Sequence, residues 1–195
     1  MNYLQITHED VCNGVGLRVV LWLSGCSHQC LNCQNPQTWN PDNGALFDKL
    51  AEQEIFTELS KDYISGLTLT GGDPLYKTNL NEVLSLINLI RTLFPEKTIW
   101  LYTGYTIQLC NVPYVDVDND FEITSRSFLA VTKPSKDTKV NLIREAIIND
   151  VDVLVDGEYM DEQRDVTLKW RGSKNQRVID VKKSLAQHEI VLYCD

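Results

Sequence analysis

Four short runs rich in strand-forming residues occur along this chain, and each one ends at a glycine or at polar residues. Amphipathic stretches with a helical period separate them. Repeated strand–helix units require a mostly parallel sheet with helices outside it, because a crossover joins each strand to the next one in the sheet. The pattern therefore predicts an α/β fold, either an open sheet or part of a barrel. The predicted strands are residues 19–23, 67–70, 98–103 and 152–155.

Three stretches carry apolar residues at helical spacing and are predicted as helices. They are residues 46–59, 79–94 and 140–148. The second has a start and a stop signal. Asn79 precedes Glu82 by three residues, as in a capping box, and Pro95 ends the helix.

The chain of 195 residues fits one domain, residues 1–195, which is long enough to bury a hydrophobic core. Residues 105–139 break the alternation with two prolines, an acidic run at 116–120 and a strand-like stretch at 121–131. We expect an insertion at about 105–139. A separate small domain is the less favoured interpretation, because the segment is too short for its own core.

Four chemically distinctive segments each follow a predicted strand. Because parallel strands end at one edge of a sheet, and this edge carries the site in α/β folds, the four segments are expected to lie together. This expectation does not depend on the identification of any motif. The segments are residues 26–33, 71–74, 102–105 and 156–159.

Cys26, Cys30 and Cys33 form a C-x3-C-x2-C triplet. About 0.006 chance matches to this spacing are expected from the cysteine content. Three thiolates in one loop favour an iron–sulfur cluster with one iron free of protein ligands. The main alternative is structural zinc, which prefers four protein ligands. The fourth zinc ligand would be His28, which shows no spacing to a catalytic partner, or one of Cys12, Cys110 and Cys194.

The net charge is −9, with 27 acidic against 18 basic residues. This balance argues against nucleic-acid binding, which normally needs a basic face. No stretch approaches the length of a membrane helix, and the first residues lack the features of a signal peptide, so no membrane association and a cytoplasmic location are expected. The six cysteines in such a chain favour metal ligation over disulfides.

The triplet resembles the signature of the radical S-adenosylmethionine superfamily. Taken in order with six further motifs, it is similar to the activating proteins of anaerobic ribonucleoside-triphosphate reductases, over nearly the whole chain apart from the expected insertion. The last motif is the one that indicates this family. The motifs are NGVGLR at 13–18, SGC at 24–26, TGGDPL at 70–75, WLYTGY at 100–105, VDGEY at 155–159 and WRGSKNQ at 170–176.

This resemblance implies a partial (βα) barrel of the radical S-adenosylmethionine type. It also implies a [4Fe-4S] cluster on Cys26, Cys30 and Cys33 that reductively cleaves S-adenosyl-L-methionine. The resulting 5′-deoxyadenosyl radical would generate a glycyl radical on the large subunit of the reductase. A reduced flavodoxin-like protein would supply the electron. No side-chain acid, base or nucleophile is required, so no catalytic residue is expected beyond the cluster.

The resemblance assigns the cofactor to two segments. Asn32, Cys33 and Gln34 would contact the nucleoside, although the position of Asn32 is aromatic in many members of the superfamily. Gly71 and Gly72 would let the backbone approach the methionyl end, with the charge of Asp73 nearby. A turn-forming role for Asp73 is nearly as favoured.

Three alternatives stay open at this point. One is an activase of another glycyl-radical enzyme, the second is a small-molecule radical enzyme, and the third is a zinc-stabilised binding module without catalysis. Residues 169–177 are predicted as a solvated tail, with partner contacts by Arg171, Lys174 and Arg177 as the second interpretation.

Overall fold

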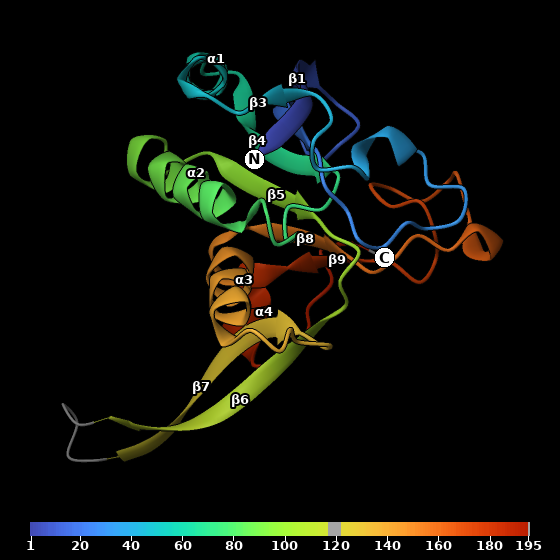
Figure 1. Ribbon diagram of the computed structural model, residues 1–195. Helices are drawn as coiled ribbons and strands as arrows, with labels where there is room; N and C mark the ends of the chain where they lie inside the picture. Colours follow the sequence, from blue (N-terminus) through green and yellow to red (C-terminus); the bar gives the residue numbers. More distant parts are fainter. Residues whose placement is uncertain (117–121, 195) are drawn as a thin grey trace.

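The computed structural model describes residues 1–116 and 122–194, so most of the acidic run at 116–120 lies outside the described residues. A seven-stranded sheet forms the centre, in the order β3-β1-β2-β4-β5-β8-β9 (Figure 1). Its middle is parallel: β2 (Leu17–Leu23) pairs with β4 (Ile64–Gly71), β4 with β5 (Thr98–Tyr102), and β5 with β8 (Val153–Asp156). The four predicted strands and their parallel pairing are therefore confirmed.

The sheet edges are antiparallel and were not predicted. β1 (Asn2–Asp10) pairs with β2, the short β3 (Ala45–Leu46) pairs with β1, and β9 (Arg177–Asp180) pairs with β8. The result is a mixed α/β sheet with a parallel centre. Its closure into a partial barrel stays a prediction.

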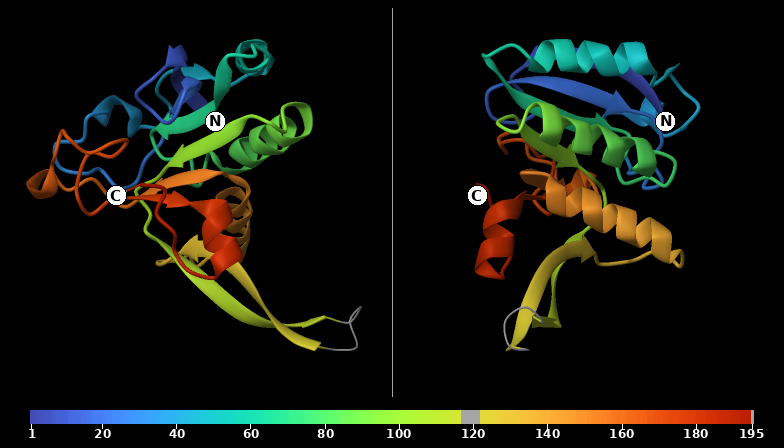
Figure 2. Two further views of the ribbon diagram at one scale, coloured as in Figure 1. Left: turned by 180° about the vertical axis from the view of Figure 1, so that it is seen from behind. Right: turned by 90° about the vertical axis from the view of Figure 1, so that its left-hand side faces the viewer.

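The three longest helices lie side by side along one face of the sheet (Figures 1 and 2). They are α1 (Lys49–Leu59), α2 (Leu80–Leu93) and α3 (Thr138–Asp150), and the shorter α4 (Val181–Gln187) follows β9. Their apolar stripes bury a core with strands β2, β4 and β5. None of the helices in the described part of the chain is long and apolar enough to cross a membrane.

One predicted helix start was wrong, and a second helix starts where predicted but without the expected side-chain cap. The first helix begins at Lys49 rather than residue 46, because Leu46 pairs in β3 and Asp48 caps the helix by accepting from the backbone N–H of Leu50 and Ala51, both at 3.0 Å. At α2 the side chain of Asn79 makes no cap. Its amide instead donates to the carbonyl oxygens of Ser24 (2.9 Å) and Asp73 (3.1 Å), which ties the start of α2 to two site loops.

The region expected as an insertion contains a long antiparallel hairpin. β6 (Ile107–Asp116) and β7 (Glu122–Val131) form a two-stranded sheet of their own. The hairpin projects from the body of the molecule (Figure 1). Asn149 of α3 secures its base, because its side chain accepts from the backbone N–H of Leu129 at 2.8 Å and donates to the Leu129 carbonyl at 2.9 Å.

Candidate functional site

The four segments that follow the predicted strands meet at one edge of the sheet, as expected. They line a single cavity of about 120 Å³, to which each of the loops after β2, β4, β5 and β8 contributes. The register pairs Leu23 with Gly71, and Leu101 with Leu154, so these strands end side by side. Parallel pairing thus carries segments that are distant in sequence to one place.

The cysteine loop, residues 24–35, has little regular structure but is anchored by backbone hydrogen bonds. Gly25 N–H donates to the Thr38 carbonyl at 2.7 Å, and Cys26 N–H donates to the Trp39 carbonyl at 3.1 Å. Within the loop, Cys33 N–H donates to the Cys30 carbonyl at 3.1 Å. Residues 38 and 39 therefore hold the Cys26 end of the triplet, and the Cys33 end is bonded within the loop, while residues 27–29 make no backbone–backbone hydrogen bond to the described residues.

The three thiols of the triplet are free and half-buried. Cys26 and Cys30 line the 120 Å³ cavity, and Cys33 lines a neighbouring one. Within the described residues, no three His, Cys, Asp or Glu side chains are arranged to hold a single metal ion. A cubane cluster takes each thiolate on a different iron, so its ligands need not converge on one point.

Burial raises the pKa of the Cys26 thiol to about 11, and the nearby carboxylate of Asp73 adds to the shift. Burial also raises the pKa of Cys30. A bound metal ion deprotonates such thiols outright, so these shifts describe the cluster-free protein.

In cluster-free protein we expect iodoacetamide to label exposed Cys12 well before Cys26. The thiolate is the nucleophile, and at neutral pH a thiol with a pKa of about 11 holds only about one part in 10⁴ as thiolate. The labelling rate of Cys26 should rise about tenfold per pH unit up to about pH 11. Mass spectrometry of peptides at several pH values measures both rates. A Cys26 labelling rate that no longer rises above pH 8 would contradict the raised pKa of Cys26.

The glycine turn, residues 71–74, abuts the cysteine loop through its backbone. Gly72 N–H donates to the Leu23 carbonyl at 2.7 Å, and Asp73 N–H donates to the Gly25 carbonyl at 2.8 Å. A Cβ on Gly72 would lie 2.6 Å from the Gly25 carbonyl oxygen, closer than atoms can pack. Only glycine at position 72 therefore permits this approach of the two segments.

Asp73 is buried, and its carboxylate accepts several hydrogen bonds. It accepts from the Leu75 N–H at 2.8 Å, the Thr103 hydroxyl at 2.9 and 3.0 Å, and the Gly104 N–H at 3.0 Å. The turn-forming role considered for Asp73 is thus present, and it extends to the loop after β5. A contact of Asp73 with a cofactor stays a prediction.

The imidazole of His28, which lies between Cys26 and Cys30 in the sequence, also contacts neighbouring loops. Its Nδ1 lies 2.7 Å from Glu158 Oε1, and its Nε2 lies 3.0 Å from Asp73 Oδ2, although the ring N–H at Nε2 is not aligned for a hydrogen bond. Burial lowers the pKa of His28, but the two carboxylates outweigh that effect and raise the pKa overall. Because both nitrogens face carboxylates, His28 is not positioned as a fourth metal ligand.

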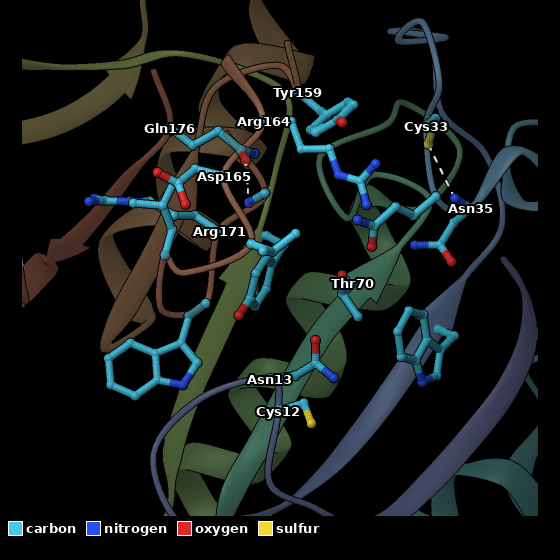
Figure 3. A pocket seen from close by; sticks show the side chains of 17 residues that line it. Cys12, Asn13, Cys33, Asn35, Thr70, Tyr159, Arg164, Asp165, Arg171 and Gln176 are labelled. Atoms are coloured by element: carbon cyan, nitrogen blue, oxygen red, sulfur yellow. Dashed lines mark hydrogen bonds between the residues drawn. The ribbon is translucent and has the colours of Figure 1, made fainter. Parts of the chain in front are cut away.

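A larger cavity of about 450 Å³ lies between the cysteine loop and residues 159–176 (Figure 3). Cys33 and Asn35 lie on one side, and the side chain of Arg164 extends from the other side across the cavity. Of the residues predicted to contact the nucleoside, Cys33 and Gln34 line this cavity. Asn32 does not line it, and its amide donates to Asp161 Oδ2 at 2.7 Å.

Tyr102 and Tyr159 line both cavities. They belong to the segments 102–105 and 156–159 that were expected at the site, although neither was nominated as a cofactor-binding residue. The hydroxyl of Tyr102 is buried and has no hydrogen-bond partner among the described residues. Burial raises its pKa, so it remains a donor at neutral pH. Tyr102 is the last residue of β5 and the first of the segment 102–105 at the site. This position in the sequence could have identified it as a site residue.

The predicted solvated tail at 169–177 was wrong, because this segment folds back onto the loop after β8. Gln176 donates to the Gly157 carbonyl at 3.0 Å, and Asn175 donates to the Glu158 carbonyl at 2.8 Å. Arg177, considered as a partner contact, is bonded to the buried Asp156, with its Nε 3.0 Å from Oδ1. Lys174 is exposed and lies 3.6 Å from Asp165. The segment thereby forms one wall of the larger cavity.

Comparison with known proteins decides the family. Residues 12–179 match the model of the 4Fe-4S single cluster domain. The chain is 38% identical over 190 residues to the anaerobic ribonucleoside-triphosphate reductase-activating protein of Enterobacteria phage T4, covering 97% of this chain and 100% of the relative. The chain belongs to this family of activating proteins. The proteins of the same name from Vibrio cholerae and Escherichia coli K12 are 37% and 33% identical, over 90% and 91% of this chain and 96% and 97% of theirs.

Membership in the activating-protein family confirms the resemblance drawn from the motifs. The matched domain spans the cysteine loop, the glycine turn and the segment that closes the larger cavity. It indicates an iron–sulfur cofactor, for which the cysteine triplet offers soft thiolate ligands.

Proposed function

We propose that this chain is an activase that reductively cleaves S-adenosyl-L-methionine at a [4Fe-4S] cluster, in order to generate a glycyl radical on an anaerobic ribonucleoside-triphosphate reductase. The observation that carries the proposal is the cysteine loop: three free thiols border two adjoining cavities at the edge of a parallel sheet, directly against a glycine turn. The names of the relatives supply the target.

Cys26, Cys30 and Cys33 would hold the cluster. Three thiolates leave one iron of a cube without a protein ligand, and the nearest candidate for a fourth, His28, has both nitrogens beside carboxylates. Cys110 lies on the hairpin, and Cys194 packs against the cluster that contains Trp100 and Val178. The exposed Cys12 lies on another part of the wall of the larger cavity from Cys33 (Figure 3). This arrangement supports an open coordination position.

Gly71, Gly72 and Gln34 would hold S-adenosyl-L-methionine. The two glycines bring backbone to the cavity that Cys26 and Cys30 line, and Gln34 follows Cys33 into the larger one. The cofactor would thus span the junction of the two cavities, where the buried hydroxyl of Tyr102 has a hydrogen bond to donate.

When bound, the two cofactors would supply the chemistry: one electron from the reduced cluster would break the sulfur–C5′ bond, with methionine as the leaving group, and the 5′-deoxyadenosyl radical would take a hydrogen atom from a glycine of the reductase. The electron is proposed to come from a flavodoxin-like protein. The chain would contribute binding and position, with no side-chain acid or base. The segment of the reductase that carries the glycine would enter through the larger cavity, past Arg164 and Tyr159.

The test begins with protein purified and reconstituted without oxygen. It should be brown, contain about four irons per chain, and release 5′-deoxyadenosine when reduced in the presence of S-adenosyl-L-methionine. Addition of an anaerobic reductase should give a glycyl doublet by electron paramagnetic resonance.

Three results would separate the parts of this proposal. A colourless protein with one zinc, or a full cluster that releases no 5′-deoxyadenosine, would refute the radical chemistry. Release of 5′-deoxyadenosine without a doublet on the reductase would instead show that the target is another molecule.

A further inference from the structure

We infer that His28 is a positioning residue: its imidazole joins the cysteine loop to the loops after β4, β5 and β8, and so fixes Cys26 and Cys30 relative to the cofactor cavity. The part of the inference that concerns cofactor binding rests on the proposed function. The part that concerns the loop depends on the geometry of the chain alone.

The ring of His28 contacts all three neighbouring loops. Nε2 lies 3.0 Å from Asp73 Oδ2 in the loop after β4, and Nδ1 lies 2.7 Å from Glu158 Oε1 in the loop after β8. The ring also packs edge-on against Tyr105, with a centroid distance of 4.7 Å. A Cβ on Gly104 would lie 2.5 Å from the imidazole, so the glycine leaves the space that His28 fills.

The two polar contacts of the His28 ring differ in how firmly their partner side chains are held. Asp73 is 1% exposed and already bonded to Leu75, Thr103 and Gly104, so it is a fixed point. The side chain of Glu158 is 56% exposed and can move. A contact to an immobilised, buried carboxylate holds a loop better than one to an exposed side chain, which solvent competes for. Asp73 is therefore the fixed point of the contact, while the aligned hydrogen bond of the ring is the one between Nδ1 and Glu158.

His28 matters for position because of its place in the chain. It lies two residues from each of Cys26 and Cys30, in the part of the loop with few backbone contacts. Removal of the ring would release this part from three loops at once while leaving Cys33 tied to Cys30 and Asn35. A segment with fewer contacts opens more often, and its thiols become accessible more often.

The first experiment measures thiol accessibility in cluster-free protein, with iodoacetamide and peptide mass spectrometry. His28→Phe keeps a ring above Gly104 and against Tyr105 but loses both polar contacts. His28→Gln places an amide near the position of Nε2, beside Asp73. We expect Cys26 and Cys30 to be labelled about tenfold faster in His28→Phe and within about threefold of the wild-type rate in His28→Gln, with Cys12 unchanged as the internal control.

Wild-type rates in His28→Phe would overturn the inference, because packing alone would then hold the loop. Equal acceleration of Cys12 would overturn it too, since this indicates general unfolding. Circular dichroism checks the fold of each variant. If His28→Phe does not fold, Glu158→Gln provides the test: a weaker contact at Nδ1 should accelerate labelling of Cys30 about twofold, and a rate equal to wild type would count against the inference.

The second experiment uses the cluster-loaded protein. S-adenosyl-L-methionine should change the electron paramagnetic resonance signal of the reduced cluster in wild type and His28→Gln, and should change it less in His28→Phe at equal iron content. An identical change in all three proteins would overturn the positioning role. If wild type itself shows no change, the proposed function fails, while the labelling result still decides whether His28 anchors the loop.

Discussion

Replacement of Cys30 by alanine is expected to abolish both the iron–sulfur cluster and the cleavage of S-adenosyl-L-methionine. Cys30 is the middle member of the triplet, and it lines the smaller cavity together with Cys26 and the glycine turn. Two thiolates rarely retain a cube, so anaerobically reconstituted Cys30→Ala should be colourless, with iron near background. The 5′-deoxyadenosine released should fall at least about a hundredfold, as expected when an essential metal ligand is lost.

Cys110→Ala is the matched control, because it removes a half-buried thiol from β6, on the hairpin away from the triplet. Its iron content and product yield should equal those of the wild type. Circular dichroism must show that Cys30→Ala is folded. A brown Cys30→Ala protein with a full complement of iron would refute the ligand assignment.

The parts of the site that were predictable share one property, namely that they lie at the ends of apolar parallel strands. The cysteine loop follows β2 and the glycine turn follows β4, and the strands themselves are marked by runs of buried residues such as Leu21 and Leu69. Once the strands are placed in parallel, the meeting of their ends follows from the architecture. The convergence could therefore be predicted before any family was named.

Other parts of the site could not be predicted, because they depend on contacts between residues that no sequence pattern connects. His28 and Glu158 are 130 positions apart, and each is an ordinary polar residue in its own segment. The segment at 169–177 has the composition of an exposed tail, yet the side-chain amides of Asn175 and Gln176 donate to the loop after β8. Asn79 had the spacing of a helix cap, but its amide nitrogen donates to the carbonyls of Ser24 and Asp73, and its oxygen makes no cap. Tertiary contacts decided each case.

The missed strands have a physical explanation too. β1 is half-exposed along most of its length, so it lacks the continuous apolar run that marks β2. In the hairpin, β7 agrees with the strand-like stretch predicted at 121–131, whereas β6 was not predicted, and its residues Gln108 and Val112 are exposed. Strands at edges and in projecting hairpins bury one face or less, which leaves little hydrophobic signal.

Replacement of Arg18 by methionine is expected to cause the largest loss of stability of any single change considered. Arg18 is fully buried near the start of β2, and its guanidinium joins three strands. Nε donates to Thr68 Oγ1 at 2.7 Å, and Nη2 donates to the carbonyl oxygens of Leu67 at 2.6 Å and Thr98 at 2.9 Å. The guanidinium also lies 5.5 Å from the ring centroid of Trp100. Burial lowers the pKa of Arg18 to about 10, so it stays charged at neutral pH.

Methionine fills part of the space but donates nothing, so buried oxygens on β4 and β5 would lose charged donors. Hydrogen bonds from charged groups contribute about 1.5–3 kcal/mol each, and partial relaxation should limit the total to about 3–5 kcal/mol. Urea unfolding of the reduced, cluster-free protein should show the midpoint lowered by about 1–2 M. Arg18→Lys should lie in between, because an ammonium cannot bond in the planar arrangement of the guanidinium.

Lys139→Met serves as the control, since it removes one positive charge from an exposed position at the start of α3 and should change stability by less than about 0.5 kcal/mol. A midpoint for Arg18→Met equal to that of Lys139→Met would contradict the prediction. Such a result would mean that water replaces the guanidinium between the strands, and that the parallel centre of the sheet holds together without it.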